Sequence, residues 1–138
     1  MNRVNELRRI RENIEILREQ EEKYSRPILS NMSMIRNLYD VFCMILKCQD
    51  CGKPTESDNR KKFLYAILYI FSPSTLVGGS MRYRMRECVT EIIGCTSTGV
   101  SRDYKTAMFF YDTYNSFRES VDGIIRGMLK VIGKTDEI

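Results

Sequence analysis

Residues 81–114 read MRYRMRECVTEIIGCTSTGVSRDYKTAMFFYDTY, and this stretch decides the fold class. Apolar side chains recur in it every three or four residues, which is the period of an amphipathic helix. The first apolar stripe comprises Met81, Met85, Cys88, Val89, Ile92 and Ile93. The second stripe comprises Val100, Tyr104, Ala107, Met108 and Tyr111. The pattern predicts two helices and a short polar turn, in which a left-handed Gly94 lets the chain reverse within three or four residues.

In the segments before this stretch, the apolar residues also recur with the period of a helix. A broad apolar face predicts a central, heavily buried helix that begins at about Ser30 or Ser33 and ends at Lys47. Residues 49–59 contain Gly, Pro and a polar run, so they predict a loop. Residues 60–71 are apolar almost all round and predict a second buried helix.

The last helix is expected to begin at Ser116, where Ser116 and Glu119 have the spacing of a capping box. Gly133 is expected to end it. Because no segment alternates with a period of two residues, no strand is predicted. The sequence therefore predicts an all-α fold, a compact bundle of about six helices that contains a helix-turn-helix.

Residues 1–26 differ from the rest of the chain. Their apolar positions follow a 3-4-3 spacing, flanked by opposite charges, at Leu7, Ile10, Ile14 and Leu17. This spacing is that of a coiled-coil seam, and Pro27 should end the helix. We expect an amphipathic, coiled-coil-like helix at 1–26 and one helical domain at 27–138, with its helix-turn-helix at about 81–114. The seam predicts a homo-oligomer or a helix docked on the protein's own body, and the parallel, antiparallel and intramolecular arrangements remain open.

Composition narrows the class of protein. The 138 residues are 43% apolar and 29% charged, which is typical of one globular domain. Histidine is absent, so the commonest general base is missing, and we expect neither an enzyme nor a bound cofactor. No apolar run is long enough for a membrane span and the first residues are charged, so we expect a cytoplasmic protein that makes no membrane contact. The net charge is +4, with basic runs at 60–62 and at 82–86.

Five cysteines without a secretory signal predict free thiols in a reducing compartment. Cys48 and Cys51 form a CxxC pair followed by glycine, which makes them a weak candidate for zinc. A structural zinc site needs four ligands. The other cysteines, Cys43, Cys88 and Cys95, have irregular spacing, so no metal is predicted.

Residues 86–105 resemble the helix-turn-helix of bacterial and phage DNA-binding regulators, most closely in the run GCTSTGVSR at 94–102. The resemblance implies that the helix at 97–114 contacts double-stranded DNA. It implies readout of the bases by Thr96, Ser97, Thr98, Ser101, Arg102 and Lys105. It implies phosphate contacts by Arg82, Arg84 and Arg86. Two positions depart from the pattern, because Thr90 stands where alanine is usual and Asp103 where an aliphatic residue is usual.

Two functions follow as expectations. The first is a small DNA-binding protein, a regulator or a phage-type packaging or accessory factor, similar in style to phage and mobile-element proteins. The second is a structural or adaptor protein of a virion or another assembly that makes only protein contacts, suggested by the aromatic-rich region 104–117. Phe109 and Phe110 cannot both share the side of Tyr104 and Tyr111. One of the two is therefore an exposed interface anchor or lies buried under a neighbouring helix.

Overall fold

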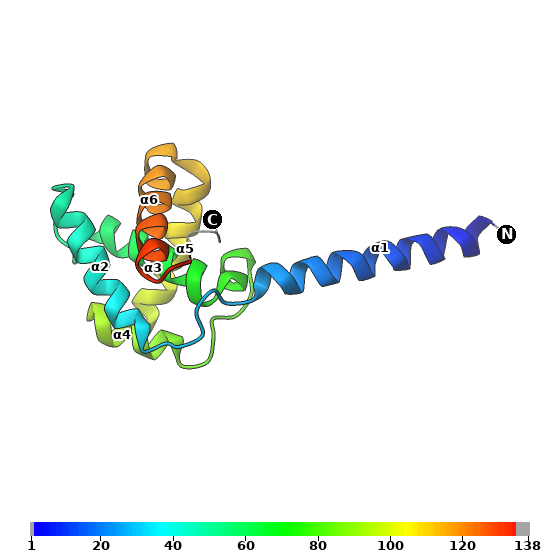
Figure 1. Ribbon diagram of the computed structural model, residues 1–138, viewed down its shortest axis with the longest axis horizontal. Coiled ribbons are helices and arrows are strands. Elements are labelled where there is room, and N and C mark those ends of the chain that lie inside the picture. The colour runs from blue at the N-terminus through cyan, green and yellow to red at the C-terminus, as the bar shows by residue number, and fades with distance from the viewer. Residues whose placement is uncertain (1, 135–138) are drawn as a thin grey trace.

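The computed structural model describes residues 2–134, and in that range the chain forms six α-helices and one 3-10 helix (Figure 1). In chain order these are α1 (Asn2–Ser25), α2 (Met34–Cys48), α3 (Ser57–Phe71), η1 (Pro73–Val77), α4 (Met85–Ile93), α5 (Ser97–Thr113) and α6 (Asn115–Val131). The prediction of an all-α fold with six helices and a long N-terminal helix is confirmed. None of the helices within these residues is both long and apolar enough to cross a bilayer.

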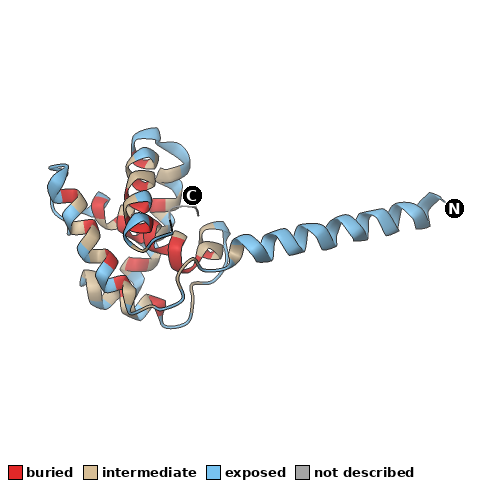
Figure 2. Ribbon diagram, viewed as in Figure 1, coloured by how far each residue is buried: buried red, intermediate tan, exposed pale blue. Residues whose placement is uncertain are grey.

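Helix α3 forms the centre of the core. It contacts α2, α5 and α6, and most of its side chains are buried (Figure 2). The Phe63 ring packs against Tyr39 and Phe42 of α2, with ring centroids 5.0 Å and 5.2 Å away. The predicted burial of residues 60–71 is confirmed, although the helix begins three residues earlier, at Ser57.

The early start of α3 comes from a polar residue that the sequence suggested was part of a loop. Asn59 is buried, and its Nδ2 donates to the carbonyls of Cys51 (3.1 Å) and Lys53 (2.9 Å). These bonds tie the 49–56 loop to the first turn of the helix. A side chain that satisfies a buried turn in this way has no periodicity, so the apolar pattern could not locate the start of α3.

The predicted capping box at the start of the last helix is wrong. Helix α6 begins at Asn115, its N-cap is Tyr114, and no side chain caps it. A single extended residue, Tyr114, separates it from α5, so Ser116 already lies inside the first turn. The side chain of Arg118 instead donates to the carbonyls of Tyr111 and Asp112 at 2.9 Å each and stabilises the C-terminal end of α5. Gly133 follows the end of α6 in a left-handed conformation, as expected.

Helix α1 projects away from the helical body (Figures 1 and 2). It has no buried residue and ends before Pro27, as predicted. Its base is fixed, since the amide of Ile28 donates to the carbonyl of Ile70 (2.8 Å) and Arg82 donates to the carbonyl of Ser30 (2.8 Å). The apolar seam of this helix is therefore not docked on the protein's own body.

The packing of α5 against α6 includes a tyrosine with a perturbed pKa. The Tyr111 hydroxyl donates to Asp122 Oδ1 at 2.7 Å. Burial, and then the Asp122 carboxylate, raise the pKa of Tyr111 to about 12 from its ordinary value of 10.0. The folded chain keeps this proton where the unfolded chain has lost it, so the free energy of unfolding should fall as the pH rises from 10.0 to about 12. We expect Tyr111→Phe to make that fall shallower in chemical denaturation curves recorded across this pH range, and an unchanged slope would contradict the assignment.

Candidate nucleic-acid interface

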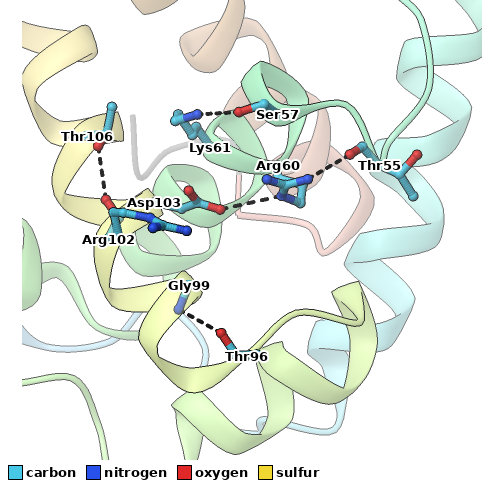
Figure 3. A network of polar contacts seen from close by, with 9 residues as sticks. All are labelled: Thr55, Ser57, Arg60, Lys61, Thr96, Gly99, Arg102, Asp103 and Thr106. Carbon is cyan, nitrogen blue, oxygen red and sulfur yellow. Dashed lines mark hydrogen bonds and ion pairs between the residues drawn. The ribbon is translucent and has the colours of Figure 1, made fainter.

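The turn between α4 and α5 consists of the residues 94–96. Gly94 ends α4 in the predicted left-handed conformation, with φ 70°, and its amide donates to the carbonyl of Thr90 at 2.9 Å. Thr96 caps α5, and its Oγ1 accepts a hydrogen bond from the Gly99 amide at 3.0 Å (Figure 3). A Cβ at position 99 would lie 3.1 Å from that oxygen, closer than ordinary contacts allow. The glycine inside the helix therefore makes room for the cap.

Apolar side chains hold the two helices to the body. Met85 and Val89 of α4 and Val100 of α5 belong to the same buried cluster. Val100 is fully buried, whereas Ile93 is only half-buried, because it lies in the last turn of α4 at the edge of the cluster.

Asp103 is one of the two departures from the helix-turn-helix pattern, and the structure gives it a partner. It lies buried, with Oδ2 3.4 Å from Nε of Arg60 on α3 (Figure 3). Arg60 also donates to the carbonyl of Thr55 at 2.9 Å. The ion pair joins α5 to α3. Burial, and then the Asp103 carboxylate, raise the pKa of the Cys95 thiol, which favours its neutral form.

One face of α5 remains open to solvent. It carries Thr98, Arg102 and Lys105, which are exposed and follow each other by four and three residues. Within residues 2–134, the Arg102 guanidinium and the Lys105 ammonium have no hydrogen-bond or ion-pair partner. The same stripe continues to Phe109, which is 58% exposed, while Phe110 packs against Phe117. The sequence analysis did not decide which of the two phenylalanines is exposed. The four-residue step from Lys105 to Phe109 is a signal that could have decided it, because it places Phe109 on the same face as Lys105.

The other expected base-reading residues lie around this face. Ser97 is exposed, and Ser101 is half-buried beside it. Thr96 is exposed, but its oxygen is engaged in the cap of α5.

The three arginines expected at phosphates lie at the far end of α4 from the turn. Arg84 is exposed and Arg86 is half-buried. The guanidinium of Arg82 instead binds the backbone, donating to the carbonyls of Leu29, Ser30 and Phe71. This arginine therefore joins the segment after α1 to the end of α3, and we leave it out of the interface.

The side chains of the basic run at 60–62 contact other residues of the same chain. Arg60 pairs with Asp103, and Lys61 donates to Ser57. The Lys62 ammonium lies 6.0 Å from the centroid of the Phe117 ring. The run therefore contributes to the packing of α3 rather than to the open face of α5.

The cysteine pair lies away from this surface. Cys48 is the last residue of α2 and Cys51 lies in the following loop, both exposed. In the part of the chain that the structure describes, no group of three or more His, Cys, Asp or Glu side chains is placed to hold a metal ion. The pair thus offers two thiols without the further ligands that a structural zinc site needs.

No protein-family model, no curated protein and no solved structure matches this chain.

Proposed function

We propose that this protein binds double-stranded DNA through the open face of α5, as a regulator or as a phage-type packaging or accessory factor. One observation carries the proposal: Arg102 and Lys105, which have no partner among the residues that the structure describes, lie one turn apart on a helix that follows a three-residue turn. A helix of this kind fits the major groove, and its first turns approach the base edges most closely.

The residues of this face have different chemistry toward DNA. Ser97 and Thr98 are small donors and acceptors at the start of α5, where short side chains let the backbone come close to a groove. The planar guanidinium of Arg102 suits guanine, to which it can donate two hydrogen bonds. The ammonium of Lys105 is a point charge suited to a phosphate. Arg84 and Arg86 supply further phosphate contacts from the start of α4. With so few cations, the salt dependence of binding should be moderate.

The test is a titration of random-sequence duplex DNA with the protein at several salt concentrations, with binding measured by fluorescence anisotropy. We expect Arg102→Ala with Lys105→Ala to weaken binding by more than about tenfold, since each lost contact contributes roughly 1–3 kcal/mol. The slope of log affinity against log salt should fall by about 0.9 for each phosphate contact removed.

A matched control removes two exposed cations elsewhere, Lys47 on α2 and Lys130 on α6. We expect Lys47→Ala with Lys130→Ala to retain most of the affinity. If the control loses as much affinity as the α5 variant, binding follows the net charge and α5 is not the interface.

The alternative function is a structural or adaptor role with protein contacts alone. It is favoured by the exposed Phe109 ring, which lies 6.4 Å from the half-exposed Tyr114 ring and shares the open face of α5. Exposed aromatic residues of this kind anchor protein interfaces. Absence of DNA binding even at low salt supports this alternative. The DNA-binding function operates in the cytoplasm of a bacterial host, whereas the alternative operates in a virion or another assembly.

A further inference from the structure

We infer that the apolar seam of α1 binds a second copy of this chain as a parallel, two-stranded coiled coil. The inference starts from an exposed surface. Leu7, Ile10, Ile14 and Leu17 are between 42 and 62% exposed, although they form one continuous stripe. An apolar stripe of this length on a soluble helix is normally covered by a partner.

Helix α1 needs such a partner for its own stability. Its 24 residues extend about 36 Å, at 1.5 Å per residue, and they contact η1 of the body. Its ion pairs, Glu6 with Arg9 and Glu22 with Arg26, are exposed and so contribute little. Helices in proteins draw most of their stability from the packing of an apolar face. The apolar face of α1 is not buried by any of the residues 2–134, so the helix obtains this packing from another chain.

The charges beside the seam favour a protein partner over a membrane. The helix carries as many acidic as basic side chains, on both flanks of a narrow stripe. Helices that lie on membranes have a wide apolar face and an excess of lysine and arginine. The narrow seam of α1 instead fits the heptad repeat of a coiled coil. Leu7 and Ile14 occupy position a, and Ile10 and Leu17 occupy position d.

The flanking positions identify the partner as a second copy in parallel register. In that register, each g position faces the e position of the next heptad in the other chain. Glu6 then faces Arg11 of the other copy, an attraction that occurs twice in a symmetric pair. Asn13 faces Arg18 and Gln20 faces Ser25, so these two pairs bring no like charges together. An antiparallel pair instead sets e against e, which brings arginines of the two copies together.

Sedimentation velocity over a range of protein concentrations tests the seam. We expect the wild type to reach the mass of two chains. We expect Ile14→Asp to weaken association by more than about a hundredfold, because it buries unpaired carboxylates at the seam. The matched control is Ile16→Asp, at an exposed position of the same helix outside the seam. A wild type that stays monomeric, or a control that dissociates as readily as Ile14→Asp, would overturn the inference.

A charge exchange tests the orientation. Arg11→Glu places glutamates against each other in the parallel pair and should weaken association roughly fivefold. Adding Glu6→Arg restores the attraction with reversed signs and should recover it. If Arg11→Glu leaves association unchanged or strengthens it, or if the double variant does not recover, the parallel register is wrong. These measurements use the full chain without DNA, so they succeed or fail independently of the proposed DNA binding.

Discussion

Replacement of Phe63 by alanine is expected to lower the free energy of unfolding by about 3–5 kcal/mol. The Phe63 side chain is fully buried, and its ring packs between α3 and α2 against Tyr39 and Phe42. Truncation removes this contact area and leaves a cavity, because the neighbouring side chains relax only partly into it. The loss should appear in urea denaturation followed by circular dichroism.

Phe109→Ala provides the matched control, since it makes the same chemical change at an exposed ring. We expect it to alter the free energy of unfolding by less than about 1 kcal/mol. Equal losses for the two variants would show that burial in the α2–α3 interface does not determine the effect.

Replacement of Arg60 by alanine is expected to lower the free energy of unfolding by about 1–3 kcal/mol. The variant leaves the Asp103 carboxylate, 9% exposed, without its cation. Removal of one partner from a buried pair is strongly destabilising, but the Arg60 side chain is 30% exposed and solvent screens part of the loss. Thermal or urea unfolding gives the measurement.

Two further variants isolate the cause of that loss. Arg102→Ala removes an exposed arginine next to Asp103 in sequence and should change the free energy of unfolding by less than about 0.5 kcal/mol. Arg60→Met with Asp103→Leu replaces both charges by apolar groups and should recover much of the stability. If the double variant is as unstable as Arg60→Ala, the unpaired carboxylate is not the cause.

The residues close to the turn before α5 were sufficient to predict much of its structure from the sequence. Gly94 lies where a left-handed residue is needed, and the stripe from Val100 to Tyr111 runs along the predicted helix. Hydrogen bonds between neighbours in sequence fix such features, so they are visible in the residue order. The capping box at Ser116 failed because α6 begins one residue earlier, at Asn115, so Ser116 already lies inside its first turn and no side chain caps the helix.

The roles of the charged residues depended on partners distant in sequence. Arg60 and Asp103 are 43 residues apart, and Arg82 binds carbonyls up to 53 residues away. In the sequence, these arginines were indistinguishable from Arg102, which has no protein partner among the described residues. Only the arrangement of α3, α4 and the segment after α1 separates structural cations from available ones.

The sequence alone determined that the chain is all-helical, that a long charged helix precedes the other helices, and where the chain turns at Gly94. Periodicity and turn chemistry act over a few residues, so they are visible in the residue order. The tertiary structure alone decided that α1 projects from the body with its seam exposed, that Phe109 faces solvent, and that Asp103 is paired in the core. Burial and charge pairing are properties of segments brought together in space, and an exposed apolar stripe and a covered one have the same spacing in sequence.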